Sequence, residues 1–491
     1  MKIDFHNRYH RLSPSLFERV APTPVEAPRL IVFNRTLADE LGIDHVGCDD
    51  DTLAQLFSGN RLPAGSDPIA MAYMGHQFGH FNPGLGDGRA ILLGQVNAEA
   101  GRPFDIQLKG SGRTAYSRNG DGRSALGPVL REYLVSEAMH RMGVPTTRAL
   151  AAVTTGEQVA RERLIPGGVF TRVSNNLVRV GTFQSIAYRE DRDALVQMID
   201  YCIQTSYPEL TGSDDKAGAL LAGVIDRQAS LIARWMCLGF IHGVMNTDNM
   251  SIAGETIDYG PCAFMDAFAH DRVYSSIDHH GRYAYNQQPN IAIWNLSRLA
   301  ETLLPELDDD EDEAVKRATQ KLENFAPAWQ QYWLDGMRNK LGILDRRPDD
   351  RTLVDDLLKT MAANEADFTL TFHHLTRSLM DEEGATADLY SLFNTTAKLE
   401  EWLTLWRIRL TQDDHDIAEQ HAAMQHANPV YIPRNHQIEV VIRAAEDRDD
   451  LEPFHRLNEV LSDPMSYQIA RDDYMLPPRP EQIVHQTFCG T

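Results

Sequence analysis

The segment HGVMNTDNMSIAGETIDYG, from His242 to Gly260, carries the polar residues on which the fold assignment depends. The stretch before it, from Lys216 to Leu238, is predicted to be one long helix because it is rich in apolar residues and has no breaker. Within the quoted segment, TIDYG begins a short strand and turn that continues into PCAF. The remaining polar stretch is therefore a loop between a long helix and a short strand.

Two parts of this loop region resemble protein-kinase motifs. His242 and Asn249 match the first and last letters of the kinase catalytic loop H-R-D-L-x-x-x-N, and Asp258 in DYG matches the Asp of D-F-G. Val244 stands where the kinase loop has its catalytic Asp, and an apolar side chain cannot accept a proton from a hydroxyl group. The site is thus predicted to be kinase-shaped, with the usual base missing.

Three upstream features follow the kinase order. GLGDG, from Gly84 to Gly88, is a glycine loop between predicted strands. Lys109 ends the predicted strand IQLK, and Glu132 lies on the next predicted helix, where an ion pair could orient Lys109. Taken singly, these features are typical of a hairpin turn, a solvated lysine and a helix-surface acid. Their joint order and placement favour the kinase-like fold.

A dinucleotide-binding reading of the glycines is weaker. Gly84 and Gly86 fit G-x-G, but Arg89 occupies the place of the last glycine and a strand follows where a helix should begin. The predicted fold class is α+β, a protein-kinase-like two-lobe fold with a helical C-terminal extension. The expected parts are a leader packed on the body (1–70), a strand-rich N-lobe (71–185), a helical C-lobe core (186–300) and the extension (301–491).

Composition narrows the function. The 491 residues carry a net charge of −23, which disfavours general binding to nucleic acid. Between Asn82 and Gly181, however, 13 Arg or Lys face 8 Asp or Glu, and such a basic island suits a small polyphosphate ligand. We expect no secretory signal and no membrane span, and hence a cytoplasmic protein. The 5 scattered cysteines contain no CxxC and predict neither a disulfide framework nor a zinc site.

Longer motifs resemble one family. FNPGLGDGRA, DIQLKGSGRTAYSRNGDGRSALGPVLREYL, HGVMNTDNM, TIDYGPCAFMD and GRYAYNQQPNIAIWNLSRLAETL are together similar to the selenoprotein O family, also called the YdiU family. The resemblance covers essentially the whole chain. It implies a pseudokinase-fold enzyme that moves AMP from ATP to Ser, Thr or Tyr hydroxyls of client proteins and releases pyrophosphate. It further implies that the nucleotide is bound flipped relative to kinases and that UMP transfer from UTP with Mn²⁺ is conceivable.

The resemblance also implies roles for individual residues. Asp248 would act as the base in place of the missing Asp, although an Asp in such a loop is also a common turn-capping residue. Asn249 and Asp258 would hold Mg²⁺ or Mn²⁺ as hard oxygen ligands. Glu132 would orient Lys109. The expected nucleotide-binding residues are Gly86, Gly88, Arg89, Lys109, Asp121, Gly122, Arg172 and Arg179.

Two of these assignments have competing readings. Without the resemblance, Arg172 and Arg179 would be read as exposed strand residues in ordinary surface salt bridges. Cys489, near the C-terminus, matches a position that is selenocysteine in many animal members, which implies a redox role and a disulfide, conceivably with Cys262. An unremarkable terminal thiol is the reading that spacing alone favours.

Three functions remain open at this stage. The first is a protein nucleotidyltransferase that uses ATP. The second is a phosphotransferase that uses the γ-phosphate with Asp248 as a displaced base. The third is a non-catalytic nucleotide-binding scaffold. Changing Asp258 to Ala is expected to remove both metal binding and transfer in either enzymatic case.

Overall fold

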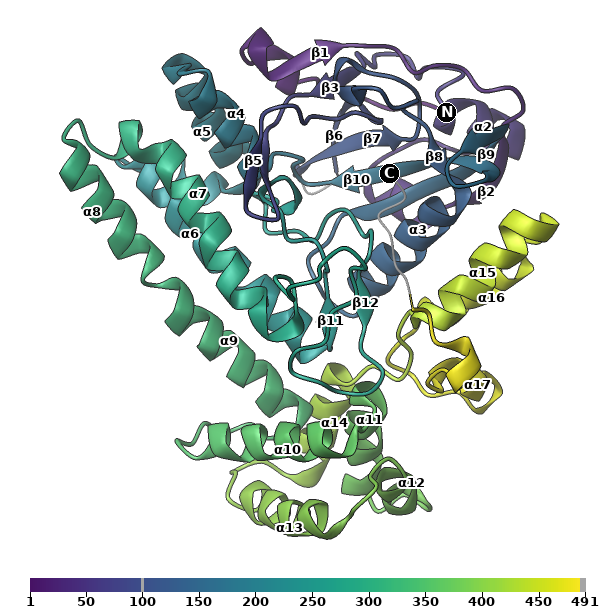
Figure 1. The fold of residues 1–491 in the computed structure, drawn as a ribbon, viewed down its shortest axis with the longest axis vertical. Coiled ribbons are helices and arrows are strands. Elements are labelled where there is room, and N and C mark those ends of the chain that lie inside the picture. The colour runs from purple at the N-terminus through teal and green to yellow at the C-terminus, as the bar shows by residue number, and fades with distance from the viewer. Residues whose placement is uncertain (99–100, 486–491) are drawn as a thin grey trace.

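A strand-rich N-terminal sheet and a helical C-terminal region make up the chain (Figure 1). The computed structural model describes residues 1–98 and 101–485. This arrangement confirms the predicted order of a mixed α and β chain, in which the strands come first and the helices follow. Asp248, Asp258 and the other loop residues singled out above lie inside the helical region, between α6 (Lys216–Cys237) and α7 (Gln288–Leu307).

The main sheet is antiparallel and has 8 strands, in the order β1-β3-β6-β7-β10-β9-β2, with β8 paired to β10. Its strands are β1 (Phe17–Arg19), β2 (Arg29–Phe33), β3 (Ile69–Met71), β6 (Ala90–Asn97), β7 (Pro103–Lys109), β8 (Ser124–Ala125), β9 (Arg148–Ala160) and β10 (Leu164–Ser174).

The sheet is covered on both faces. Alternate residues of a strand point to opposite faces, so Ala152 of β9 joins one apolar cluster while Ala151 and Val153 join another. The first cluster includes helix α3 (Leu126–Arg141), and the second includes α1 (Arg35–Glu40) and α2 (Asp50–Phe57). The functional side chains described below lie on the α3 face.

The first 70 residues do more than pack on the body as an extended leader. They supply β1 and β2, the strands at the two ends of the main sheet, together with α1 and α2. Edge strands of only three to five residues, with prolines in the segments between them, are weakly signalled in a sequence.

Helix α3 has the ends that its sequence predicts. Pro128 lies in the first turn, where its missing N–H costs no hydrogen bond. Met142 is the C-cap, and Gly143 follows with φ +75°, a left-handed conformation that glycine adopts without strain. Glu132 is 4% exposed, so the inward face of this helix carries a carboxylate into the interior.

The helical region begins with α4 (Val180–Tyr188), α5 (Arg192–Ser206), α6 (Lys216–Cys237) and α7 (Gln288–Leu307). The predicted helix from Lys216 is thus confirmed to within one residue. Between α6 and α7 lie the short strands β11 (Phe240–Ile241) and β12 (Ala263–Phe264), which pair with each other. A small hairpin of β4 (Gly75–Gln77) and β5 (His80–Asn82) projects from the strand-rich part.

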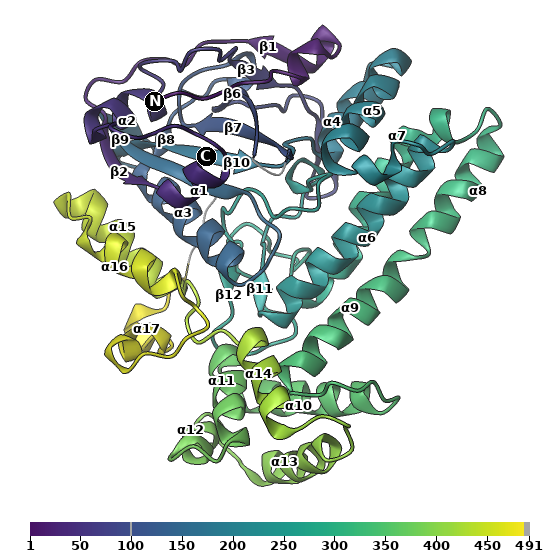
Figure 2. The same ribbon diagram turned by 180° about the vertical axis from the view of Figure 1, so that it is seen from behind.

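The C-terminal region is helical as expected, and it returns to the sheet. Its helices are α8 (Glu311–Leu322), α9 (Phe325–Lys340), α10 (Asp350–Asn364), α11 (Phe368–Leu379), α12 (Ala385–Ser391), α13 (Ala397–Leu410), α14 (Ile417–Ala427), α15 (Asn435–Arg448), α16 (Glu452–Leu461) and α17 (Asp472–Met475). Helices α10–α14 lie at the end of the molecule away from the sheet, whereas α15 and α16 lie beside α3 (Figures 1 and 2). None of the described helices is long and apolar enough to cross a membrane.

Candidate functional site

Three cationic side chains meet at one carboxylate. Lys109 Nζ lies 2.8 Å from Asp258 Oδ1, and the Arg172 guanidinium lies 2.5 Å from the same oxygen. Arg179 donates to the other oxygen, Oδ2, over 2.7 Å. Glu132 is the second acid of this group, because it accepts from Lys109 over 2.7 Å and from Arg172. We call these five residues the cation cluster.

Strand pairing brings the cation cluster together. In the antiparallel ladder of β7 and β10, Lys109 pairs with Phe170 and Gln107 pairs with Arg172. Lys109 and Arg172 are therefore two positions apart on neighbouring strands and share one face of the sheet. Helix α3 packs on that face and presents Glu132 to both cations.

Burial makes the cation cluster unusual. Arg172 is 1% exposed and Arg179 is 4% exposed, so neither makes an ordinary surface salt bridge. Burial alone would raise the pKa of Asp258, but Arg172, Lys109 and Arg179 hold this pKa well below its usual value. The five residues of the cation cluster carry three positive and two negative charges, and the buried carboxylate of Asp87 lies 3.9 Å from Arg179. The guanidinium and ammonium groups gathered at this point suit an anion with several oxygens.

The backbone at Asp258 is itself unusual. Its φ of +62° puts a non-glycine residue in the left-handed region, which costs of order 1–3 kcal/mol. Strain of this kind persists only where the surroundings hold it, and three cations hold this carboxylate. The three cations of the cation cluster thus fix Asp258 in place.

Asp248 lies beside the cation cluster on the short 3-10 turn Thr247–Asn249. Its backbone carbonyl accepts from Arg179 over 2.8 Å, and its Oδ2 accepts from the Gln77 amide over 3.2 Å. Its Oδ1 is buried and has no hydrogen-bond partner among the described residues. Burial raises the pKa of Asp248 to about 6, despite the opposing effect of Arg179. A carboxylate with one free oxygen and such a pKa can accept a proton near neutral pH.

The hairpin of β4 and β5 closes over this turn. The backbone N–H of His76 donates to Thr247 Oγ1 over 2.7 Å, and that of Phe78 donates to Asn246 Oδ1 over 3.2 Å. Gly75 is required here, because a Cβ at this position would lie 2.6 Å from Thr247 Oγ1. The hairpin therefore holds the Asp248 turn by its backbone, and Gln77 adds the side-chain contact.

Comparisons with known proteins show the family to which the chain belongs. Residues 1–462 match the family described as "Protein adenylyltransferase SelO". The chain belongs to this family. It is 55% identical over 487 residues to the "Protein nucleotidyltransferase YdiU" of Rhodopseudomonas palustris (strain BisB5), with 99% of each chain covered. The protein of the same name from Agrobacterium fabrum (strain C58) is 53% identical, also with 99% of each chain covered. The predicted family is thus confirmed, and with it the prediction of an enzyme of the protein nucleotidyltransferase class.

The glycine loop has a structural reason for its glycines. Gly86 has φ +134°, and a Cβ there would lie 2.3 Å from the ring of Tyr116. A Cβ on Gly88 would lie 2.7 Å from the carbonyl oxygen of Tyr116. Both glycines thus allow the loop to pack beneath the segment around Tyr116. Arg89 follows the loop and is half-buried.

Sequence reasoning missed Asp87, which lies between these two glycines. It is 2% exposed, accepts from Gln107 Nε2 over 2.9 Å, and lies 3.9 Å from Arg179. Burial raises its pKa to about 6. An Asp in a Gly-Asp-Gly turn is usually solvated, so only its position three residues before the strand that begins at Ala90 could have indicated otherwise.

Other predicted residues lie outside the hydrogen bonds of the cation cluster. Asp121 accepts from Arg161 over 2.9 Å and from the backbone N–H of Arg123, and its side chain is 43% exposed. Gly122 has φ +70°, and a Cβ there would clash with the backbone of Gly112. Within residues 1–98 and 101–485, neither of these two residues is hydrogen-bonded to the cation cluster. Their nucleotide-binding roles stay predictions.

Whether Asn249 and Asp258 can hold a metal ion depends on the donor atoms that surround them. Within residues 1–98 and 101–485 no group of three or more His, Cys, Asp or Glu side chains is placed to hold a metal ion. Asn249 donates through Nδ2 to the carbonyl oxygen of Val244 over 2.9 Å, which commits the amide nitrogen and leaves its oxygen for another partner. Asn249 and Asp258 together offer hard oxygen atoms, which fit Mg²⁺ or Mn²⁺ when phosphate oxygens complete the set.

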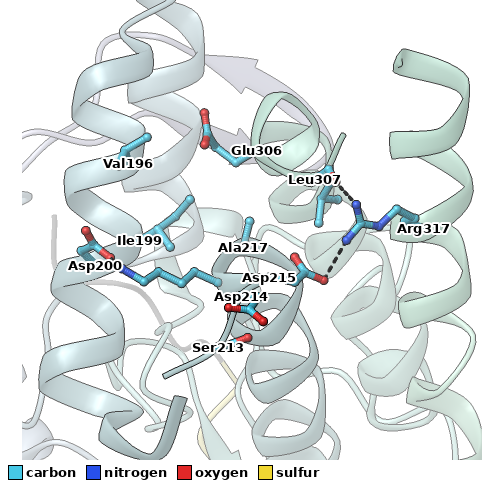
Figure 3. A pocket seen from close by; sticks show the side chains of 11 residues that line it. Val196, Ile199, Asp200, Ser213, Asp214, Asp215, Ala217, Glu306, Leu307 and Arg317 are labelled. Carbon is cyan, nitrogen blue, oxygen red and sulfur yellow. Dashed lines mark hydrogen bonds and ion pairs between the residues drawn. The ribbon is translucent and has the colours of Figure 1, made fainter. Parts of the chain in front are cut away.

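Of the two redox candidates, Cys262 is buried, while Cys489 lies outside the described residues. A separate pocket of about 320 Å³ lies between α5, α6 and the end of α7 (Figure 3). Its lining includes Asp200, Asp214, Asp215 and Glu306, with Arg317 bound to Asp215 over 2.9 Å. This excess of carboxylates disfavours a phosphate ligand there.

Proposed function

We propose that this chain transfers AMP from ATP to Ser, Thr or Tyr hydroxyl groups of client proteins and releases pyrophosphate. UTP with Mn²⁺ would serve as a second donor, giving UMP transfer. The observation that supports this most is the cation cluster, in which Lys109, Arg172 and Arg179 converge on one buried point beside Asp248. The family and relatives that the chain matches are named for the same reaction class.

The architecture proposed for this activity is a protein-kinase-like two-lobe fold. Residues 71–185 would form the strand-rich lobe and residues 186–300 the core of the helical lobe. Residues 1–70 and 301–491 would be additions to these lobes. The order of glycine loop, Lys109, Glu132 and Asp258 along the chain supports this reading, as does the ion pair of Lys109 with Glu132.

The triphosphate would replace Asp258 as the partner of the cations. All three cations lie within 2.8 Å of that carboxylate, so its oxygens mark where anionic oxygens are bound. A guanidinium presents several N–H donors in one plane and suits phosphate oxygens better than an ammonium does. The triphosphate would be neutralised along its length by Arg172, Arg179 and Lys109. Gly86, Gly88 and Arg89 precede Lys109 in the chain.

Asn249 and Asp258 would hold Mg²⁺ or Mn²⁺, which supplies charge neutralisation of the phosphates when bound. Asp258 becomes available for this once the cations turn to the phosphate oxygens. Glu132 would keep Lys109 oriented throughout, since it is bonded to that ammonium over 2.7 Å.

Asp248 would act as the base. The acceptor oxygen forms a bond to the α-phosphorus, the bond from that phosphorus to the bridging oxygen of the β-phosphate breaks, and pyrophosphate leaves with that electron pair. The hydroxyl proton passes to Asp248 Oδ1, which has no other partner among the described residues. Loss of the usual kinase Asp at Val244 is tolerated, because such transfers depend mainly on positioning and charge neutralisation.

The test is mass spectrometry of acceptor peptides after incubation of the full chain and a protein acceptor with ATP or UTP. The proposal predicts a mass increment of AMP or UMP on a hydroxyl side chain. An increment of one phosphate group would instead indicate a phosphotransferase, and an unmodified acceptor with bound nucleotide would indicate a scaffold.

A further inference from the structure

Arg131, the residue before Glu132 on α3, joins three parts of the chain. Its Nε donates to the carbonyl oxygen of Gly260 over 2.9 Å, and another guanidinium nitrogen donates to the carbonyl oxygen of Cys262. The same nitrogen donates to Asn435 Oδ1 over 2.9 Å. Arg131 thus connects α3 to the turn that follows Asp258 and to the first residue of α15.

Helix α15 contacts α3 at a second place. The backbone N–H of Gly127, in the first turn of α3, donates to Glu446 Oε1 over 3.1 Å. A Cβ on Gly127 would lie 2.8 Å from that oxygen and 2.9 Å from Ile442 Cγ2, so a larger residue would push the two helices apart. Figures 1 and 2 show α15 and α16 lying along α3. The start and end of α15 therefore both hold α3.

The start of α15 is itself anchored. Arg434, directly before Asn435, is fully buried and donates to Asp367 over 2.8 Å and to Asp266. Its Nε donates to the carbonyl oxygen of Met475 over 3.1 Å. Asp367 begins α11, and Asp266 follows β12, so the position of Asn435 is fixed from both sides. Hydrogen bonds of a buried guanidinium to carboxylates are among the stronger ones in proteins.

We propose that α15 positions Glu132 and Asp258 for nucleotide binding, and that Arg131 and Asn435 are the positioning residues through which it acts. The guanidinium of Arg131 connects the α3 backbone next to Glu132 to the turn after Asp258 by hydrogen bonds to two carbonyl oxygens. Asn435 accepts from the same guanidinium and so holds it in place. A shift of α3 by one ångström would break the 2.7 Å bond from Lys109 to Glu132. The inference rests on the proposed function in that the ligand is a nucleoside triphosphate.

The chemistry of Asn435 gives a sharp test. Only its amide oxygen is used, because its Nδ2 is buried without a partner among the described residues. Asn435→Asp keeps an oxygen acceptor for Arg131, whereas Asn435→Leu removes the acceptor at nearly the same size. Leu399→Ala in α13 serves as the control, because it removes a fully buried side chain from a helix away from α3.

The experiment is calorimetric titration of the full-length variants with ATP and magnesium, alongside their thermal unfolding. We expect Asn435→Leu to weaken ATP binding by about five- to tenfold, less than the full effect of losing a hydrogen bond to a charged group, because this bond acts on ATP only through the position of α3. Asn435→Asp should bind within about twofold of the unchanged protein. Leu399→Ala should bind ATP normally even where its melting temperature falls further.

Equal ATP affinity of Asn435→Leu and the unchanged protein would overturn the inference. So would an equal loss of affinity in Leu399→Ala, because the effect would then be one of general stability. If Asn435→Leu does not fold, Arg131→Lys replaces it. A lysine cannot reach both carbonyl oxygens and Asn435, so it should show the same loss. The two proposals can fail separately. If α15 does not position the site, the unchanged protein still transfers AMP. If the chain does not transfer AMP, the titrations still measure how tightly each variant binds ATP.

Discussion

Replacing Arg172 by Met tests the cation cluster quantitatively. The change keeps an unbranched side chain and removes the charge that binds Glu132, Asp258 and Gln107. Removing one partner of a buried ion pair costs about 3–5 kcal/mol when the other partner is left alone. Here both carboxylates keep Lys109, so we expect the free energy of unfolding to fall by about 2–4 kcal/mol.

The same change should also weaken ATP binding. The formal charge of the cation cluster falls from +1 to 0, and one charge-assisted contact to phosphate is lost. Such a contact contributes about 1.5–3 kcal/mol, which corresponds to a loss of about 10- to 150-fold in affinity. Calorimetric titration with ATP measures the affinity, and urea denaturation measures the stability.

The matched control is Arg192→Met, which removes an arginine that is 62% exposed and bound to Glu306 over 2.7 Å. A surface pair of this kind contributes little to stability, so the control should bind ATP normally. An Arg172→Met protein that binds ATP within twofold of the unchanged protein would refute the assignment of Arg172 to the phosphate site.

Four further predictions concern Asp258, Asp248 and Glu255. Asp258→Asn should abolish transfer. It should also tighten ATP binding in the absence of metal, since the carboxylate that competes with the phosphates for the cations loses its charge. Weaker metal-free ATP binding, measured by titration, would contradict this. Asp248→Asn should lower the transfer rate by about 10²–10⁴-fold with little change in ATP affinity. Because the pKa of Asp248 is raised to about 6, transfer by the unchanged protein should be lost as pH falls below about 6 in a rate profile. Glu255 accepts a hydrogen bond from Ser174 Oγ, at the end of β10, over 2.7 Å, and burial raises its pKa to about 7. The stability that this carboxyl provides when protonated is therefore lost as pH rises from about 4.5 through 7. By urea denaturation, the unchanged protein should lose up to about 3 kcal/mol relative to Glu255→Gln over that range, and parallel pH curves would refute this.

The sequence predicted those site residues that follow a pattern along the chain. Lys109 ends a strand, Glu132 faces inward from the next helix, and Asp258 follows Asn249 at a fixed spacing, so each could be named before the structure. The burial of Arg172 and Arg179 could not be predicted, because an arginine on a strand is usually solvated. Strand alternation places Arg172 on the α3 face only once the pairing with β7 is known.

Contacts between residues distant in the sequence account for what was missed. Gln77 reaches Asp248 across 171 positions, and Arg131 reaches Asn435 across 304. No local pattern of hydrophobicity or spacing signals such pairs. The edge strand β1 was missed for a different reason, because its three residues are too few to show alternation.

The measurement that tests the central claim most directly is transfer from ATP labelled separately at the α and γ phosphates. The full chain is incubated with a protein acceptor and each labelled ATP, and the acceptor is then isolated. Our account predicts label on the acceptor from the α position alone, because the cations bind the departing pyrophosphate while AMP is transferred. Label from the γ position alone would contradict it.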